Sequence, residues 1–155
     1  MRAWTAWLAA LGALAVCAAP APAVRPTDIA RVDEYIDAPR ALFGRTRAEV
    51  ERRLGAPAAE RARGAGARLA YPGLEIAVSR TSRVAAVIVG AAGHALPHGL
   101  DVGAPRSRVE AVLGEAQDMT DDRYFYIDSD GFPNTVEFFF RHDRVTRIEW
   151  SFWTE

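Results

Sequence analysis

Residues 103–114 of the chain read GAPRSRVEAVLG, and residues 44–55 read GRTRAEVERRLG. The two stretches share the pattern G-x-x-R-x-x-V-E-x-x-L-G in the same register, 59 residues apart. Self-similarity at a fixed spacing is the sequence signature of duplicated structural units. The sequence therefore predicts two tandem repeats of one small unit.

Each copy of the pattern has the features of a short helix. Val50 and Leu54 lie four residues apart, as do Val109 and Leu113, so each pair shares one helical face. A helix of about three turns is marginal in isolation. We therefore expect both helices to bury these pairs against another part of the molecule.

Capping residues mark the ends of both predicted helices. A capping box pairs a hydroxyl side chain with a glutamate three residues later, and the sequence offers one in each copy: Thr46 with Glu49, and Ser107 with Glu110. The glycine that ends each pattern suits the positive φ that follows many helices, where a Cβ would clash.

Three strands are predicted after each helix. Alternation of apolar and polar residues marks a half-buried strand, and Leu74, Ile76 and Val78 show it clearly. The predicted strands are 68–71, 74–78 and 84–89 in the first repeat, and 123–127, 135–141 and 144–153 in the second. Residues 58–67 are predicted to be a loop or helix tail, and the segment around Asp118 a loop. The expected fold class is α+β: two tandem repeats of a short helix followed by a three-stranded antiparallel sheet.

The expected domain boundaries follow from the repeat and from a leader. Residues 1–23 have Arg2, an apolar run and an A-x-A cleavage site, the features of a signal peptide. An N-terminal helical segment at 24–41, ending at Pro39, precedes the first repeat at 42–90, a linker at 91–99 and the second repeat at 100–155. The mature chain is therefore expected to be periplasmic or secreted. Membrane contact is expected only if Cys17 is lipidated, and Val16 before it is a poor match to a lipobox.

Charge and cysteine content bear on the class of partner. All 19 basic residues are arginine and the formal net charge is −1, which does not support nonspecific nucleic-acid binding. Residues 24–90 carry 12 arginines against 8 acidic residues, whereas residues 91–155 carry 6 against 12. This asymmetry either orients a partner or is drift between repeats. Cys17 is the only cysteine, so the mature domain depends on its core rather than on disulfides.

No catalytic or metal-binding constellation is recognisable. The sequence has no G-x-S-x-G, no H-E-x-x-H, no phosphate-binding loop and no cysteine nucleophile after processing. His94 and His98 lie four apart, but Pro97 disfavours a helix that would bring them together. The loop at Asp128 lacks EF-hand spacing, since Gly131 comes two residues early. We therefore expect a non-enzymatic protein without a cofactor or metal site.

Aromatic residues gather in the second repeat. Ten of the chain's 15 aromatic residues follow residue 120, and strand alternation places them on both sheet faces, which one short helix cannot cover. Tyrosine and tryptophan also dominate protein-binding hot spots. We therefore expect some of Tyr124, Tyr126, Phe139 and Trp153 to stay accessible and to bind a partner. The alternative is a core shared between the repeats.

The unit G-x-x-R-x-x-V-x-x-x-L-G-x-P, followed by antiparallel strands, resembles the SmpA/OmlA (BamE-like) family of small outer-membrane assembly lipoproteins. It is equally similar to the secreted β-lactamase-inhibitor proteins, which have two such units in tandem. The resemblance covers roughly residues 42–152 and is carried by Gly44, Val50, Leu54, Gly55, Pro57, Gly103, Val109, Leu113 and Gly114. It implies a non-enzymatic protein that binds other proteins through sheet or loop surfaces. Glu115 and Ala116 replace the usual proline after the second helix, and no inhibitory loop motif is recognisable.

Two functions are consistent with these features. The first is an exported, non-catalytic protein-binding module of the bacterial envelope. The second is a binder of a small ligand or lipid that uses an aromatic-lined sheet. A deep, enclosed apolar pocket would favour the ligand binder, whereas an open aromatic sheet with a polar rim would favour the protein binder.

Overall fold

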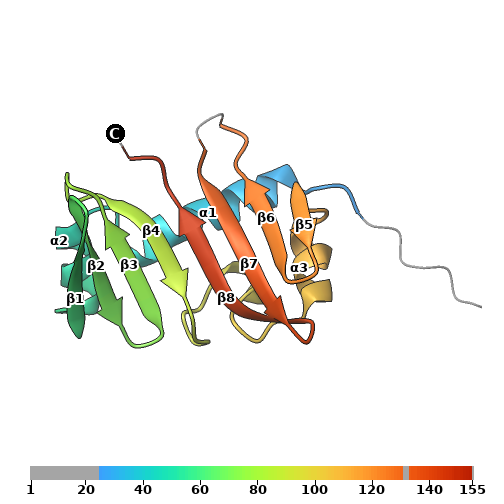
Figure 1. The fold of residues 1–155 in the computed structure, drawn as a ribbon. Coiled ribbons are helices and arrows are strands. Elements are labelled where there is room, and N and C mark those ends of the chain that lie inside the picture. The colour runs from blue at the N-terminus through green and yellow to red at the C-terminus, as the bar shows by residue number, and fades with distance from the viewer. Residues whose placement is uncertain (1–24, 131–132, 155) are drawn as a thin grey trace, which may run out of the picture.

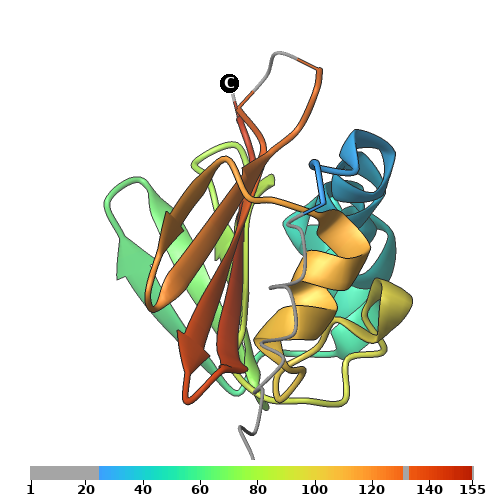
Figure 2. The same ribbon diagram turned by 90° about the vertical axis from the view of Figure 1, so that its right-hand side faces the viewer.

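The computed structural model of the protein describes residues 25–130 and 133–154, in which three α-helices lie on one side of an eight-stranded antiparallel sheet (Figure 1, Figure 2). The predicted α+β class is confirmed. The helices are α1 (Ile29–Phe43), α2 (Arg47–Leu54) and α3 (Arg106–Leu113), with a short 3-10 helix, η1, at Pro97–Gly99. The strands are β1 (Ala59–Arg63), β2 (Gly66–Tyr71), β3 (Leu74–Val78), β4 (Val84–Val89), β5 (Asp118–Thr120), β6 (Arg123–Ile127), β7 (Thr135–Arg141) and β8 (Arg144–Ser151). The predicted signal peptide and Cys17 lie outside the described residues.

Four strands, rather than the predicted three, follow each of the helices α2 and α3. The extra strands are β1 and β5, so the prediction of loops at 58–67 and around Asp118 is wrong. β1 is exposed at every residue and β5 has only three residues, so neither carries the apolar alternation by which strands are recognised. Backbone pairing holds each of them, β1 to β2 and β5 to β6.

The two sets of four strands meet at the centre of one sheet. The sheet order is β1-β2-β3-β4-β8-β7-β6-β5, so the last strand of each set pairs with the other (Figure 1). In this antiparallel junction Val87 pairs with Trp150, and Val89 with Ile148. The sheet is therefore continuous across both copies of the sequence pattern.

The C-terminal ends of α2 and α3 each accept a hydrogen bond from a tyrosine of the sheet. The Tyr71 hydroxyl donates to the Gly55 carbonyl at 3.3 Å, and the Tyr126 hydroxyl donates to the Gly114 carbonyl at 3.0 Å. Gly55 and Gly114 end the two copies of the pattern and have positive φ angles of 82° and 74°. The tyrosines of β2 and β6 thus fasten equivalent helix ends to the sheet.

The capping box predicted at α2 is present, whereas the one predicted at α3 is not. Thr46 is the N-cap of α2: its hydroxyl accepts from the Glu49 N–H at 3.3 Å, and the Glu49 carboxylate accepts from the Thr46 N–H at 3.0 Å. At α3 the N-cap is Pro105, without a side-chain cap bond. Because α3 begins at Arg106, Ser107 lies inside the first turn and cannot act as the cap.

We expect the substitution Glu49→Gln to reduce the loss of stability that the protein shows as the pH falls. The N–H groups of Arg45 and Thr46 hold the pKa of the Glu49 carboxyl below its ordinary value. A carboxyl with a depressed folded-state pKa stabilises the fold above its unfolded-state pKa, and this contribution is lost as the pH falls through the folded-state pKa. Thermal melts between about pH 7 and about pH 3 should show a smaller fall in Tm for the variant. The control is Glu115→Gln, whose exposed carboxylate makes no hydrogen bond within the described chain; equal acid dependence in both variants would contradict the prediction.

Helix α1 continues through Pro39 to Phe43, whereas the sequence predicts its end at Pro39. Proline has no backbone N–H, so it leaves the carbonyl of Tyr35, one turn earlier, without its helical donor. The indole Nε1 of Trp150 donates to this carbonyl at 3.1 Å. The Tyr35 ring also stacks on Trp150, and its hydroxyl donates to the Leu100 carbonyl at 2.5 Å. The helix tolerates Pro39 because β8 replaces the lost hydrogen bond.

The C-terminal ends of α2 and α3 differ in what covers them. Two backbone hydrogen bonds of 2.9 Å tie residues 25–28 to the end of α3. A Cβ at Gly114 would lie 2.1 Å from the Pro26 carbonyl oxygen, so only glycine permits this approach. Leu113 is consequently buried. Leu54 of α2, which the repeat predicts to be buried as well, is 37% exposed, and for this residue the prediction is wrong.

The core fills the layer between the sheet and the helices (Figure 2). At its centre the Tyr35 ring stacks on both Phe138 and Trp150, with centroids 5.4 Å apart in each pair. All three side chains are fully buried. Alternate residues of β2, β3, β4, β6, β7 and β8 supply this core, so their neighbours point to the opposite face of the sheet.

Candidate functional site

The sheet face turned away from the helices, the outer face below, is covered by no other element of the described chain (Figure 2). Buried and accessible residues alternate along the strands, as in β7 and β3. The buried set faces the helices and the accessible set forms the outer face. This surface is therefore made of side chains from all eight strands.

Aromatic and paired charged side chains are prominent on the outer face of β5–β8. The Arg147 guanidinium lies over the Phe139 ring, with Cζ 3.8 Å from the centroid. Arg123 joins the carboxylates of Asp118 at 2.5 Å and Glu137 at 3.0 Å across three neighbouring strands. Cation–π contacts and cross-strand ion pairs restrict these side chains. This part of the outer face is therefore ordered before any partner binds.

Small side chains make the outer face of β2–β4 shallow. Ala77 and Ala86 are direct cross-strand neighbours there, and Ala70 lies on the next strand. A hollow of about 380 Å³ opens beside them, with Ala70 and Ile88 among its lining residues and with arginines from β2 and β8. Without large side chains in the way, a partner can approach the strand backbones closely at this point.

The four aromatic residues predicted to be accessible divide into two pairs. Tyr124 and Tyr126 lie on the inner face at 6% and 0% exposure, so the prediction is wrong for them. Helix α3 covers that face, and the Tyr126 hydroxyl bonds to the carbonyl of Gly114 at its end. Phe139 is half-buried on the outer face, and Trp153, beyond the end of β8, is 58% exposed. The alternative of a shared core therefore holds for the two tyrosines.

Alanine variants should separate these pairs by stability. Tyr126→Ala removes a fully buried ring and its hydrogen bond, and we expect it to lower the free energy of unfolding by about 3–5 kcal/mol. Trp153→Ala should change it by less than about 0.5 kcal/mol, as for other exposed positions. Urea denaturation measures both. A loss of several kcal/mol for Trp153→Ala would contradict the exposed position of that ring.

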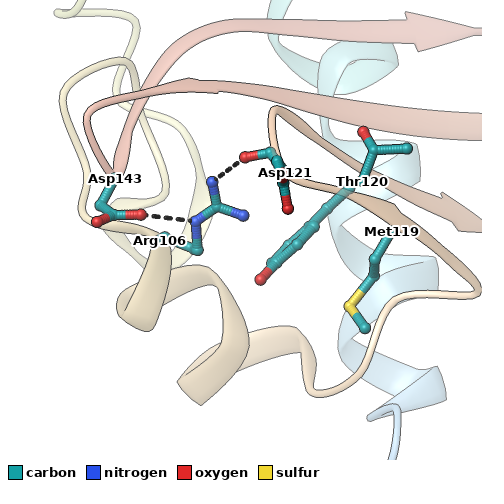
Figure 3. A pocket seen from close by; sticks show the side chains of 6 residues that line it. Arg106, Met119, Thr120, Asp121 and Asp143 are labelled. Atoms are coloured by element: carbon teal, nitrogen blue, oxygen red, sulfur yellow. Dashed lines mark hydrogen bonds and ion pairs between the residues drawn. The ribbon is translucent and has the colours of Figure 1, made fainter.

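A polar hollow of about 490 Å³ lies at the start of α3, and Figure 3 shows the side chains around it. The Arg106 Nε donates to the Asp143 carboxylate at 3.1 Å, and its Nη2 donates to the Asp121 carbonyl at 2.5 Å. Tyr124 forms one wall, and its hydroxyl donates to the Glu110 carboxylate. Burial is the main cause that raises the pKa of Tyr124, so the phenol stays protonated. The hollow thus has a fixed cation beside a neutral donor.

The counterpart of Arg106 in the first half is Arg47, and its surroundings are closed. Arg47 donates to both carboxylate oxygens of Glu60, at 2.7 and 2.9 Å. Met119 takes the place of Glu60 in the pairing of β5 with β6. The second half has a thioether where the first has a carboxylate, and the space beside its arginine stays open.

Trp153 lines a third hollow of about 180 Å³, together with Arg40, Arg45 and Arg83. Arg40 also lies over the Phe152 ring, with Cζ 4.4 Å from the centroid. Three guanidinium groups beside an exposed indole make this end of β8 positively charged.

The described residues contain neither a cluster of metal-binding side chains nor a helix that could span a membrane. Within residues 25–130 and 133–154, no three His, Cys, Asp or Glu side chains are grouped so that they could hold a metal ion. No helix of this part of the chain has the length and apolar character needed to cross a bilayer. The absence of a cofactor and of enzymatic activity stays a prediction from the sequence.

Sequence reasoning did not place the basic and small residues on one face of the sheet. Arg61 and Arg63 lie on β1, which the sequence predicts to be a loop or helix tail. The signal available in the sequence was Gly64, which lies between two short polar runs. In the structure this glycine has a φ of +57° and lies in the hairpin turn between β1 and β2. Gly-containing turns between short runs are typical of hairpins.

Comparisons with known proteins show similarity of fold. The chain matches no protein-family description and no curated protein. Among solved structures, it is similar to a DUF4309 family protein (YjgB) from Bacillus subtilis, with a TM-score of 0.52 and 12% sequence identity. The alignment covers 80% of this chain and 99% of that chain. At this level of identity the similarity shows that the two chains share a fold.

Proposed function

We propose that the protein is a non-catalytic protein-binding module, exported to the bacterial envelope, that binds its partner with the outer face of the sheet. The observation that carries the proposal is the composition of that uncovered face. Antiparallel sheets commonly have one face in water, so openness alone decides nothing. Here the face carries Phe125, Phe139 and Ile88, all half-buried, among charged side chains.

The arrangement of these side chains supports a macromolecular partner. Protein interfaces are enriched in aromatic residues and arginine, and on this face Phe139 is the cross-strand neighbour of both Arg123 and Arg147. Phe139 and Arg147 already form a cation–π contact, and Arg123 forms ion pairs with two carboxylates. Binding would therefore lose little side-chain entropy at these positions. The face spans eight strands, which suits a large partner surface.

Sequence features support the remaining parts of the proposal. We interpret each helix with its four strands as a copy of one unit, because the sequence pattern and the hydrogen bonds of Tyr71 and Tyr126 recur. Export follows from the signal-peptide features of residues 1–23. Binding through a sheet surface agrees with the resemblance to SmpA/OmlA and inhibitor proteins.

Site-specific photocrosslinking in an envelope extract of the host bacterium tests the proposal. A photoreactive residue at Ala86, on the outer face, should give discrete protein adducts, and the variant Phe139→Glu should abolish them. The same residue at Arg52, exposed on α2, is the control. Equal adducts at both positions, or none at Ala86, would overturn the proposal. Adducts with lipid alone at Ala86 would instead support the small-ligand or lipid binder.

A further inference from the structure

The charge of the outer face is opposite to that of the rest of the molecule. Strand register places seven arginines on it: Arg61, Arg63, Arg68, Arg123, Arg141, Arg144 and Arg147. It places four acidic residues there: Glu75, Asp118, Glu137 and Glu149. The face therefore has a net charge of +3, and because the whole chain has −1, the remainder has −4. A partner that docks on this face meets a positive surface.

Most of the excess positive charge lies on β1 and β2. Arg61 and Arg68 are direct cross-strand partners, and like charges in that position destabilise a sheet. Glu75 pairs with Arg68 at 3.0 Å, but within the described chain no carboxylate lies at ion-pair distance from Arg61 or Arg63. The fold thus keeps an arginine cluster that its own acidic residues only partly balance.

One donor of this cluster is buried without a partner. The Nε of Arg68 is inaccessible to solvent and makes no hydrogen bond in the described structure. Arg68 lines the hollow of about 380 Å³ on β2–β4, together with Glu75, Ala70, Ile88 and Arg147. A buried donor without an acceptor is costly, and a planar guanidinium is shaped to receive a carboxylate. Among the described residues, the hollow has one carboxylate, that of Glu75, which pairs with Arg68 through Nη1 and leaves its Nε without an acceptor, and it offers an apolar surface beside this arginine.

We propose that the hollow on β2–β4 binds an acidic protein segment, whose carboxylates pair with Arg61 and Arg68 and whose neighbouring apolar side chain packs on Ala70 and Ile88. This proposal rests on the proposed protein-binding function and names the chemistry of the partner. The apolar contact favours a peptide over a free anion. Long-range attraction between a basic face and an acidic segment also speeds encounter and weakens with salt.

A phage-displayed library of random peptides, selected on the immobilised mature chain, tests the proposal. Selected peptides should be rich in Asp and Glu next to an apolar residue. Arg61→Glu and Ile88→Arg should each weaken binding of such a peptide by at least about tenfold, and Arg52→Glu, with the same charge change on α2, should not. Arg61→Glu should also keep or raise the Tm, because it replaces a like-charge pair with an opposite pair. This measurement separates lost binding from lost folding.

Several outcomes would overturn this inference. Selected peptides without an acidic excess would do so, as would equal losses in Arg61→Glu and Arg52→Glu. Binding of anionic phospholipid vesicles through Arg61, with no peptide selected, would assign the face to a membrane. Peptides that depend on Phe139 but not on Arg61 or Ile88 would overturn the acidic site and leave the proposed function standing. Peptides that bind only away from the outer face would overturn both.

Discussion

Trp150→Ala should lower the free energy of unfolding by about 3–5 kcal/mol. The indole is fully buried and stacks on the Tyr35 ring, with centroids 5.4 Å apart. Its removal leaves a cavity between α1 and β8, where the two halves of the sheet meet. It also removes the donor that satisfies the Tyr35 carbonyl, which Pro39 leaves without a helical partner. Urea denaturation of the mature chain measures the loss.

The hydrogen bond can be separated from the packing by a double-mutant cycle. Trp150→Phe keeps an aromatic ring but leaves the Tyr35 carbonyl buried and unpaired, at a cost of about 1–3 kcal/mol. Pro39→Ala restores an N–H one turn after Tyr35, as in an ordinary helix. The cost of Trp150→Phe should therefore be smaller by about 1 kcal/mol in the Pro39→Ala background. Strictly additive changes would show that the indole does not replace the helical donor.

Leu113→Asp should cost about 3–5 kcal/mol, because it places a charge without a partner in the core. Leu113 is fully buried beneath residues 25–28, which cover the end of α3. Leu54→Asp, at the same place in the first copy, should change stability by less than about 1 kcal/mol, since Leu54 is 37% exposed and no segment covers it.

The pair Leu54 and Leu113 forms its own control, because sequence pattern, helix length and substitution are the same. Thermal and urea denaturation of both variants should give a large difference between them. Equal losses would mean that the end of α2 is buried in solution. A small loss for Leu113→Asp would mean that residues 25–28 do not stay on α3.

The short helices and the inner strands could be predicted because their periodicity matches their surroundings. Val50, Val109 and Leu113 are buried as the repeat predicts. Ile76 and Phe138 lie in strands whose burial alternates as their apolar residues do. Local pattern suffices where one face of an element meets the core.

The edge strands and the continuation of α1 could not be predicted from local pattern. β1 and β5 are held by backbone pairing, which leaves little trace in side-chain type. The helix passes Pro39 because of Trp150, which lies 115 residues from the carbonyl that it satisfies. A tertiary contact of this kind overrides helix propensity.

The outer face was predictable only in part. Alternation correctly predicts that Phe139 opposes Phe138 and Phe140. It does not say which side the helices cover, and so Tyr124 and Tyr126 are buried against expectation. The arginines of β1 reach this face through a strand that the sequence does not reveal.

The central pairing of β4 with β8 has a consequence for the order in which the chain folds. β4 has the sequence VAAVIV, and its partner is the last strand of the chain. Val89 therefore cannot pair until Ile148 has been synthesised. Synthesis proceeds from the N-terminus, and contacts this distant in sequence form slowly. Until β8 is complete, β4 is an apolar edge of the kind that joins other chains into aggregates. A chain that stops before Arg144 would keep that edge open, and we expect it to aggregate rather than to form a stable first half.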